Sequence, residues 1–261
     1  MSIYEDKLIL IYCVLLAFII GAVMGSFLNC AAMRICRKES LARGRSHCMS
    51  CGHVLKAGDL LPIVSWLFRK GRCRYCSEKI SVRYPLTELI MALCSVLCLL
   101  ACDISWLGLR NWLFICILFW LSLVDLEIYE IPNRGIIAAA VIWAAALPLM
   151  EEPVELLKWG LIAGLSFGVG LLVISLIMDK ILKKDTLGGG DIKLFFAIGL
   201  YLGVVKSLFT LLAACVIGLL MALLMKGRAK EQFPFGPAIA GAAFLMLLYG
   251  QPLADWYQGL L

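Results

Sequence analysis

Residues 8–32 read LILIYCVLLAFIIGAVMGSFLNCAA, and no side chain in this stretch is charged. A helix needs only ~20 apolar residues to cross a bilayer, so this stretch is long enough to span one. The rest of the chain is similarly apolar, with 62% hydrophobic residues among 261 and a mean hydropathy of +0.94. The sequence therefore predicts an all-α, polytopic membrane protein.

Outward from that stretch, the apolar runs predict about eight transmembrane helices. They cover residues 8–32, 86–102, 110–125, 135–150, 157–178, 192–204, 207–226 and 237–250. This pattern divides the chain into a first transmembrane helix (8–32), a polar domain (33–85) and a seven-helix domain (86–250). Because acidic Glu5 and Asp6 precede the first apolar run, we interpret it as a retained span and not as a cleaved signal peptide.

Most of the 24 basic residues fall on one side of this topology. They lie from Arg34 to Arg83, at Arg134, from Lys180 to Lys193 and from Lys226 to Lys230. Segments that stay cytoplasmic keep an excess of Lys and Arg, so this side is expected to be the cytoplasmic one. The net charge of +6 then reports topology, and no nucleic-acid partner is predicted.

The polar domain carries two Cys-x2-Cys pairs, Cys48 with Cys51 and Cys73 with Cys76. Each pair places two thiolates at the tip of a tight turn, and two such turns can complete a tetrahedral site for Zn2+. Leu55 and Ile80 follow the two pairs at the same distance, as in the packed knuckles of a zinc ribbon. Disulfides are disfavoured in a reducing cytoplasm, which leaves a redox pair or plain structural cysteines as the alternatives to zinc.

Two aspartates lie where apolar runs meet polar segments: Asp125 in LSLVDLEIYEIPN and Asp191 in TLGGGDIKLF. A carboxylate at the edge of hydrocarbon is costly and usually functional, and two of them can share one proton as in aspartic proteases. The alternative is that Asp125 faces solvent at a helix end while Asp191 caps the start of a helix. The residues alone leave both interpretations open.

A set of motifs in fixed order resembles the type IV prepilin leader peptidases, a branch of the GxGD intramembrane aspartic proteases. The matching elements are Gly25-Ser26-Phe27-Leu28-Asn29 with Arg34, the four cysteines, Leu61-Pro62 with Ser65, Arg69 with Gly71, Arg83-Tyr84-Pro85 with Glu88, Asp125 with Pro132-Asn133, Gly188-Gly189-Gly190-Asp191 and Pro234-Phe235-Gly236-Pro237. The resemblance runs from about residue 21 to 245, which is nearly the whole chain.

This resemblance implies that Asp125 and Asp191 are the catalytic pair. The substrate implied is a type IV prepilin or pseudopilin, whose basic leader is cut at the cytoplasmic face of the bacterial inner membrane. It also implies a second activity, N-methylation of the new amino terminus with S-adenosylmethionine. Gly71, Arg72 and Glu88 are the candidate residues for binding this methyl donor, although Gly71 could equally be a knuckle turn.

Three other functions are compatible with parts of the sequence. The chain could be a peptidase without methyltransferase activity. A transporter also uses carboxylates beside Gly- or Pro-interrupted helices, but places them nearer mid-bilayer and needs no zinc ribbon. A non-catalytic, zinc-stabilised assembly factor would not require both Asp125 and Asp191.

Overall fold

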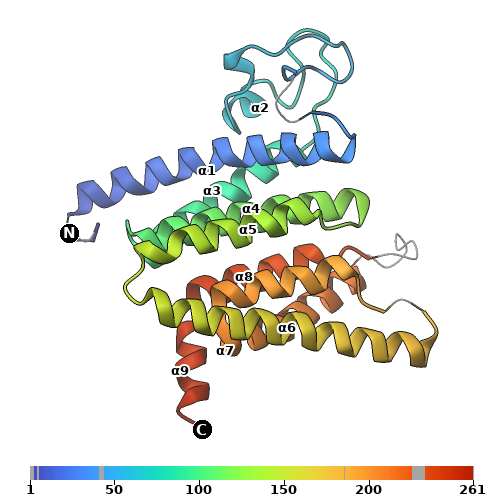
Figure 1. Cartoon of the computed structure of the whole chain (residues 1–261). Helices are drawn as coiled ribbons and strands as arrows, with labels where there is room; N and C mark the ends of the chain where they lie inside the picture. Colours follow the sequence, from blue (N-terminus) through green and yellow to red (C-terminus); the bar gives the residue numbers. More distant parts are fainter. Residues whose placement is uncertain (1–2, 5, 41–43, 185, 225–232, 261) are drawn as a thin grey trace. The chain divides into compact units, whose positions relative to one another are not determined.

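The computed structural model describes residues 3–4, 6–40, 44–184, 186–224 and 233–260, and it divides into two compact units, Met1–Ile104 and Ser105–Leu261. The first unit contains α1 (Lys7–Cys36), the 3-10 helix η1 (Ala57–Asp59), α2 (Val64–Phe68) and α3 (Arg83–Cys102) (Figure 1). The second contains α4 (Trp106–Ile128), α5 (Asn133–Ala146), η2 (Leu147–Leu149), α6 (Pro153–Leu182), α7 (Gly189–Leu224), α8 (Gly236–Tyr249) and α9 (Gln251–Gln258). In the described residues all regular elements are helical, which confirms the predicted all-α class.

Within the described residues, five helices are long and apolar enough to cross a membrane, namely α1, α3, α4, α6 and α7. The bent pair α8 and α9, with an angle of 74° between them, would make a sixth span. The helix over Asn133–Leu149 is apolar but shorter. A multi-pass membrane protein is therefore confirmed, while the predicted count of eight spans stays a prediction.

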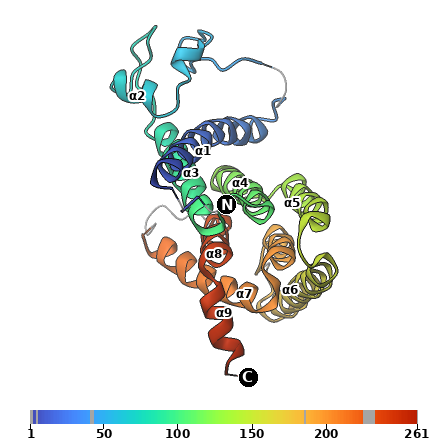
Figure 2. The same cartoon turned by 90° about the vertical axis from the view of Figure 1, so that its left-hand side faces the viewer.

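The boundary between two predicted spans lies close to Gly203. The spans 192–204 and 207–226 were predicted, and α7 consists of two helical parts that meet at Gly203, which has φ 71° and ψ −176°. Only glycine adopts these angles readily, so the helical hydrogen bonding is interrupted there without a loop. The two parts of α7 run in different directions (Figure 2). Residues 225–226 and the basic segment from Lys226 to Lys230 lie outside the described residues.

Most helices also extend beyond the predicted apolar runs. α1 continues to Cys36 although its predicted span ends at residue 32, and α4 begins at Trp106, before the predicted 110. Capping explains two of the starts, because the side chain of Asp6 accepts from Leu8 N and that of Ser105 accepts from Gly108 N. Hydropathy marks only the part of a helix inside hydrocarbon, so polar turns at the ends were missed.

In the first unit, α1 and α3 pack in antiparallel fashion through small residues. A Cβ atom on Gly21 would lie 2.7 Å from Ala92 Cα, and one on Gly25 would lie 2.9 Å from Glu88 Cα. The two backbones therefore approach each other as closely as in the small-residue contacts typical of membrane helices. The segment between them, residues 37–82, forms the cysteine domain.

In the second unit, glycines also set the close packing. A Cβ atom on Gly199 of α7 would lie only 2.6 Å from Gly164 Cα of α6. Tyr201 of α7 stacks on Phe114 of α4, with 3.7 Å between ring centroids, and donates a hydrogen bond to Ala139 O of α5 at 2.8 Å. These contacts fix the first part of α7 against three neighbouring helices.

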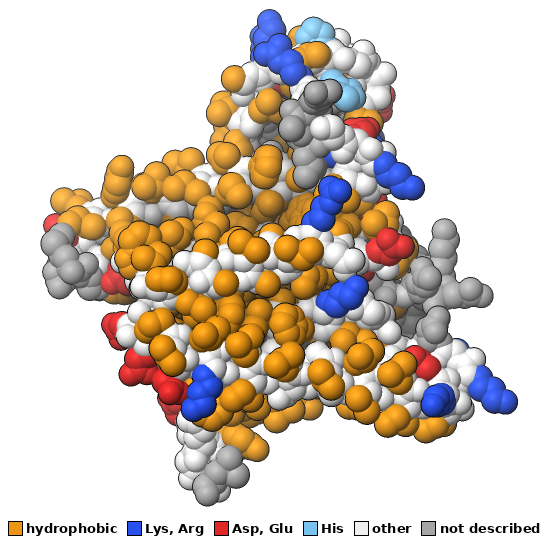
Figure 3. Space-filling view, in the orientation of Figure 1, with side chains coloured by type: hydrophobic (Ala, Val, Ile, Leu, Met, Phe, Trp, Pro, Cys, Tyr) orange, Lys and Arg blue, Asp and Glu red, His pale blue; other side chains and the backbone are white. Residues whose placement is uncertain are grey.

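The outward face of α6 suits a lipid environment. Its apolar side chains Leu165, Val169, Leu172 and Leu176 are exposed, and Figure 3 shows such side chains along the helix with charged residues near its ends. An exposed apolar surface of this kind would be unfavourable in water and is expected in hydrocarbon.

Candidate active site and metal centre

Asp125 lies one turn before the end of α4, and 5% of the residue is exposed. The helix ends at Ile128, and Tyr129, in a left-handed conformation, donates its N–H to Asp125 O at 2.9 Å. The side chain accepts a hydrogen bond from Gly236 N, with 2.8 Å between nitrogen and Oδ2. Asp125 therefore does not face solvent. This excludes the alternative interpretation in which Asp125 is a solvent-exposed residue at a helix end.

Gly236 is the first residue of α8, and its partnership with Asp125 was not predicted. A Cβ atom at this position would lie 2.8 Å from Asp125 Oδ2, so any larger residue would displace the carboxylate. The start of a helix also favours an anion because its N–H groups are unsatisfied. The only sequence signal was the motif Pro234-Phe235-Gly236-Pro237, which did not indicate what Gly236 contacts.

Asp191 lies in the first turn of α7 and is half-buried. The preceding glycines allow a close approach to the loop after α4, since a Cβ atom on Gly190 would lie 2.9 Å from Ile131 Cβ. In addition, Lys193 Nζ donates to Asn133 Oδ1 at 2.9 Å. The start of α7 therefore packs against the segment that follows Asp125.

The structure brings the two predicted acids together at one end of the second unit. Asp125 and Asp191 are close enough for the charge of one to act on the other. Two neighbouring carboxylates can hold one proton between them, which is the chemical requirement for aspartic catalysis. The position of Asp191 in the first turn of α7 also fits the alternative prediction of a capping role.

The four predicted metal ligands also converge. The Sγ atoms of Cys48, Cys51, Cys73 and Cys76 all lie within 4.8 Å of one another, and Cys48 Sγ is 3.9 Å from Cys76 Sγ. Tetrahedral zinc with Zn–S bonds of ~2.3 Å would separate its sulfurs by about 3.8 Å. The donor set and its spacing therefore fit Zn2+.

The two knuckles have matching backbone hydrogen bonds, as the spacing of Leu55 and Ile80 predicted. Leu55 N donates to Ser46 O at 2.8 Å in the first, and Ile80 N donates to Gly71 O at 2.7 Å in the second. Isolated β-bridges join the flanks at matching positions, His47 with Val54 and Arg72 with Lys79. The paired knuckles therefore present their cysteines in the same way.

The thiols of the cluster are electrostatically unequal without a metal. Backbone N–H groups of Cys51 and Ser50 lower the pKa of Cys48 to about 6. At Cys76 the backbone N–H of Glu78 also lowers the pKa, but desolvation and hydrogen bonds to the other thiols outweigh it and raise the pKa to about 12. Four neighbouring thiolates thus need a cation to coexist, and zinc would supply it.

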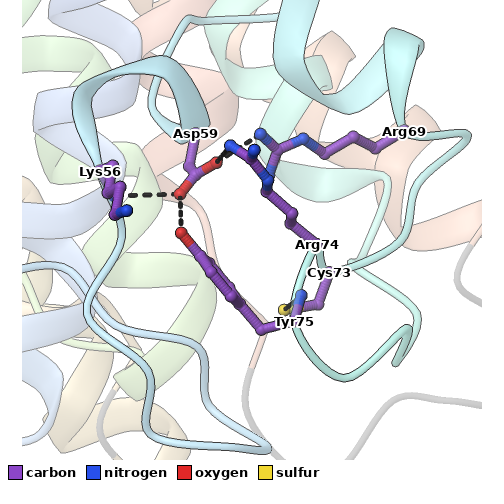
Figure 4. Close-up of polar contacts among 6 residues, drawn as sticks. All are labelled: Lys56, Asp59, Arg69, Cys73, Arg74 and Tyr75. Atoms are coloured by element: carbon purple, nitrogen blue, oxygen red, sulfur yellow. Dashed lines mark hydrogen bonds and ion pairs between the residues drawn. The ribbon is translucent and has the colours of Figure 1, made fainter.

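Asp59 organises the interior of the cysteine domain, although no spacing in the sequence indicated it (Figure 4). Its side chain, 1% exposed, forms an ion pair with Arg69 and accepts from Lys56 N and Tyr75 Oη, both at 3.0 Å. The Lys56 N–H, followed by the Arg69 and Tyr75 hydrogen bonds, lowers the pKa of Asp59 to about 2. Asp59 thus joins η1 to the second knuckle as a carboxylate.

The three residues predicted to bind the methyl donor lie in two different elements, the second knuckle and α3. Gly71 and Arg72 belong to the second knuckle, where Gly71 has φ 70° and a Cβ atom would lie 2.8 Å from the Trp66 ring. Glu88 lies in α3, and its Oε2 accepts from Ile63 N at 2.6 Å. The contacts of Gly71 and Glu88 have structural explanations, and a binding role for the three residues stays a prediction.

Comparisons with known proteins identify the family. A family model described as the Bacterial Peptidase A24 N-terminal domain matches residues 19–102, and one described as the Type IV leader peptidase family matches residues 112–223. A Bacillus subtilis protein named prepilin leader peptidase/N-methyltransferase is 36% identical over 92% of this chain and 96% of its own length. The chain belongs to the type IV leader peptidase family.

Other relatives agree with this membership. An Escherichia coli protein named type 4 prepilin-like proteins leader peptide-processing enzyme is 32% identical over 86% of this chain and 90% of its own length. A prepilin leader peptidase/N-methyltransferase from Aeromonas salmonicida is 31% identical over 82% of this chain and 74% of its own length. No solved structure matches the chain. The resemblance found in the sequence motifs is therefore confirmed over most of the chain.

Proposed function

We propose that this protein cleaves the leader from type IV prepilins or pseudopilins and N-methylates the new amino terminus. The observation that carries the proposal is that the start of α7, with Asp191, packs against the segment that follows Asp125 in α4. The names of the Bacillus subtilis and Aeromonas salmonicida relatives support both activities. A membrane-embedded substrate also fits the apolar outer face of the helices.

Cleavage would proceed by general acid and general base catalysis. The ionised aspartate takes a proton from a water molecule as the water attacks the scissile carbonyl, and the protonated aspartate donates to the carbonyl oxygen. The roles reverse when the amine leaves, so the pair returns to its starting state. The Gly236 N–H would orient Asp125 throughout this cycle by holding Oδ2.

Methylation would use the cysteine domain. S-adenosylmethionine would supply the methyl group, and the protein must hold the freed amine, deprotonated, in line with it. We retain Gly71, Arg72 and Glu88 as candidates for the donor site. Cys48, Cys51, Cys73 and Cys76 would hold zinc in a structural role, because all four positions of a tetrahedral ion are then filled by protein.

We infer a topology with eight spans and an active site at the cytoplasmic face of the inner membrane. Eight spans result when α5 is counted as a short span and α7 is divided at Gly203. The basic residues of the segment 33–85 support a cytoplasmic position for the cysteine domain. The division into a first span (8–32), a zinc domain (33–85) and a peptidase domain (86–250) belongs to the same proposal.

The test is leader cleavage by purified protein in detergent with a prepilin substrate. Asp125→Asn and Asp191→Asn should each lower the cleavage rate by about 1,000-fold or more, because an amide keeps the shape but exchanges no proton. Glu155→Gln, which changes an exposed acid at the start of α6, should cleave normally. Normal cleavage by either aspartate variant would reject the aspartic mechanism.

A further inference from the structure

The cysteine domain carries an exposed apolar patch on and beside its short helix α2. We define the α2 patch as Leu61, Val64, Leu67 and Phe68, whose exposures are 53, 45, 60 and 85%. Trp66 points the other way, because its Nε1 donates to Ile80 O at 3.1 Å and its ring lies against Gly71. The helix is therefore amphipathic, and its apolar side is not used for the core of its own domain.

The α2 patch is attached to the helix pair α1 and α3 near the end of the first span. Ile63, directly before α2, donates its N–H to Glu88 Oε2, and Glu88 Cα lies beside Gly25 of α1. Gly25 lies seven residues, or about 10 Å of helix, before the end of the first span at residue 32, so it is close to the membrane surface. α1 itself continues for about 16 Å beyond Gly25, to Cys36. The start of α2 is thus held beside the helix pair at the boundary of hydrocarbon and headgroups.

The attachment at Ile63 is specific. Ile63 has φ 61° and ψ −51°, a conformation that is unfavourable for a β-branched residue and persists only where its surroundings enforce it. The hydrogen bond to Glu88, which is itself buried, fixes this backbone. Glu88 therefore acts as a positioning residue that docks the start of α2 against α3.

The charges beside the patch complement an anionic membrane surface. Lys70 follows α2 closely, and Arg74 and Lys79 belong to the second knuckle; all three are exposed. Apolar side chains beside basic ones are typical of segments that lie in the membrane interface. Each basic residue near anionic lipid adds electrostatic attraction to the membrane surface.

We propose that the α2 patch inserts into the hydrocarbon boundary of one leaflet and that the neighbouring basic residues bind anionic lipid headgroups. α2 is then a membrane-interface anchor, separate from the spanning helices, that holds the cysteine domain against the bilayer. The partner is the lipid surface itself. This inference concerns membrane contact and does not depend on the catalytic activity.

The direct test uses the full zinc-loaded chain in phosphatidylglycerol-containing liposomes without substrate. The photoreactive residue benzoylphenylalanine replaces Phe68, and in a control variant it replaces Glu78, an exposed acidic residue of the second knuckle. After illumination, mass spectrometry should detect lipid adducts at position 68 and about tenfold fewer at position 78. Replacing phosphatidylglycerol by phosphatidylcholine should lower the yield at position 68. Absence of lipid adducts at 68, or equal yields at both positions, would overturn the proposal.

A second measurement addresses a different occupant, the hydrophobic helix of a substrate. If position 68 forms adducts only when a prepilin is added, and these adducts are with the prepilin, the patch is a substrate-docking surface and the lipid proposal is wrong. Hydrogen exchange in nanodiscs provides an independent readout. Leu67→Asn should accelerate exchange over residues 60–70, whereas Val54→Asn, at another exposed apolar position, should not. Equal effects of both variants would also contradict the proposal.

Discussion

The backbone hydrogen bonds that shape each cysteine knuckle join near neighbours in the sequence, such as Cys48 with His53, whereas Asp125 is held by Gly236, 111 residues away. The cysteine domain is thus built from two local units that a metal can join. The aspartate site is built from the ends of α4, α7 and α8, which meet only after the helices have packed. Damage to a knuckle should therefore stay local, and small changes of packing should affect the aspartates strongly.

Loss of zinc should have the largest effect of the changes considered, and it tests whether the cysteine domain is built from local units. Cys51→Ser should reduce bound zinc below about 0.2 per chain and unfold residues 44–82, because structural zinc contributes ~10 kcal/mol or more to small domains. Cys215→Ser, at an exposed position on α7, should retain about one zinc. Metal analysis and hydrogen exchange measure both. Loss of protection in α4–α8 of Cys51→Ser would contradict the local character of the domain.

Gly236→Ala tests whether the long-range contact between Gly236 and Asp125 positions the carboxylate. The new methyl group would lie 2.8 Å from Asp125 Oδ2 and should displace the carboxylate, which lowers the cleavage rate by about 100-fold. The matched control is Gly241→Ala on the same helix, where a Cβ atom meets nothing within 4 Å. If the two variants cleave equally well, the Gly236 contact does not position Asp125.

A smaller effect is expected at the start of α7. Gly190→Ala would place a methyl group 2.9 Å from Ile131 Cβ and push Asp191 away from the loop after α4, slowing cleavage by about 10-fold. Its neighbour Gly189→Ala has open space and should cleave at nearly the wild-type rate. Initial rates on one prepilin compare the two, and the reverse order of activities would contradict the described packing.

The smallest effect is expected inside the cysteine domain at Asp59. Asp59→Asn removes the charge that Arg69 and Tyr75 share and should accelerate amide exchange over residues 56–76 by about 10-fold with zinc still bound. Glu78→Gln is the control, since Glu78 is exposed. Unchanged exchange in Asp59→Asn would mean that zinc alone holds the two knuckles together.

The same contrast explains what could be predicted from the sequence. The cysteine quartet followed from spacing because its geometry is local, and the long apolar runs indicated the helices because lipid selects for hydropathy. The break between the spans 192–204 and 207–226 was predicted close to its place, but an isolated glycine in an apolar run does not reveal its φ angle, so Gly203 was not identified as the residue that makes the bend. α2 was also missed, because a helix this short has no measurable periodicity and depends on Trp66 and Glu88 for its position.

The contacts of the aspartate site are the part of the structure that could least be predicted from the sequence. Carboxylates are costly at the edge of hydrocarbon, which singles out Asp125 and Asp191 in the sequence but does not indicate which residues they contact. Gly236 and Ile131 reach the site through the packing of α8 and of the loop after α4, and no local pattern encodes such packing. Asp59 was missed for a similar reason, since its partners Arg69 and Tyr75 approach only in the folded domain.

We propose that one chain carries two separate activities, cleavage at the aspartates and methylation at the cysteine domain. The most direct measurement gives Asp191→Asn protein two substrates with S-adenosylmethionine, a full prepilin and a peptide that already begins at the mature residue. Mass spectrometry of the products then reads cleavage and methylation together. The prepilin should stay uncut, while the short peptide should be methylated once at its amino terminus. Cleavage of the prepilin, or a peptide that wild-type protein methylates and Asp191→Asn does not, would contradict the proposal of two separate activities.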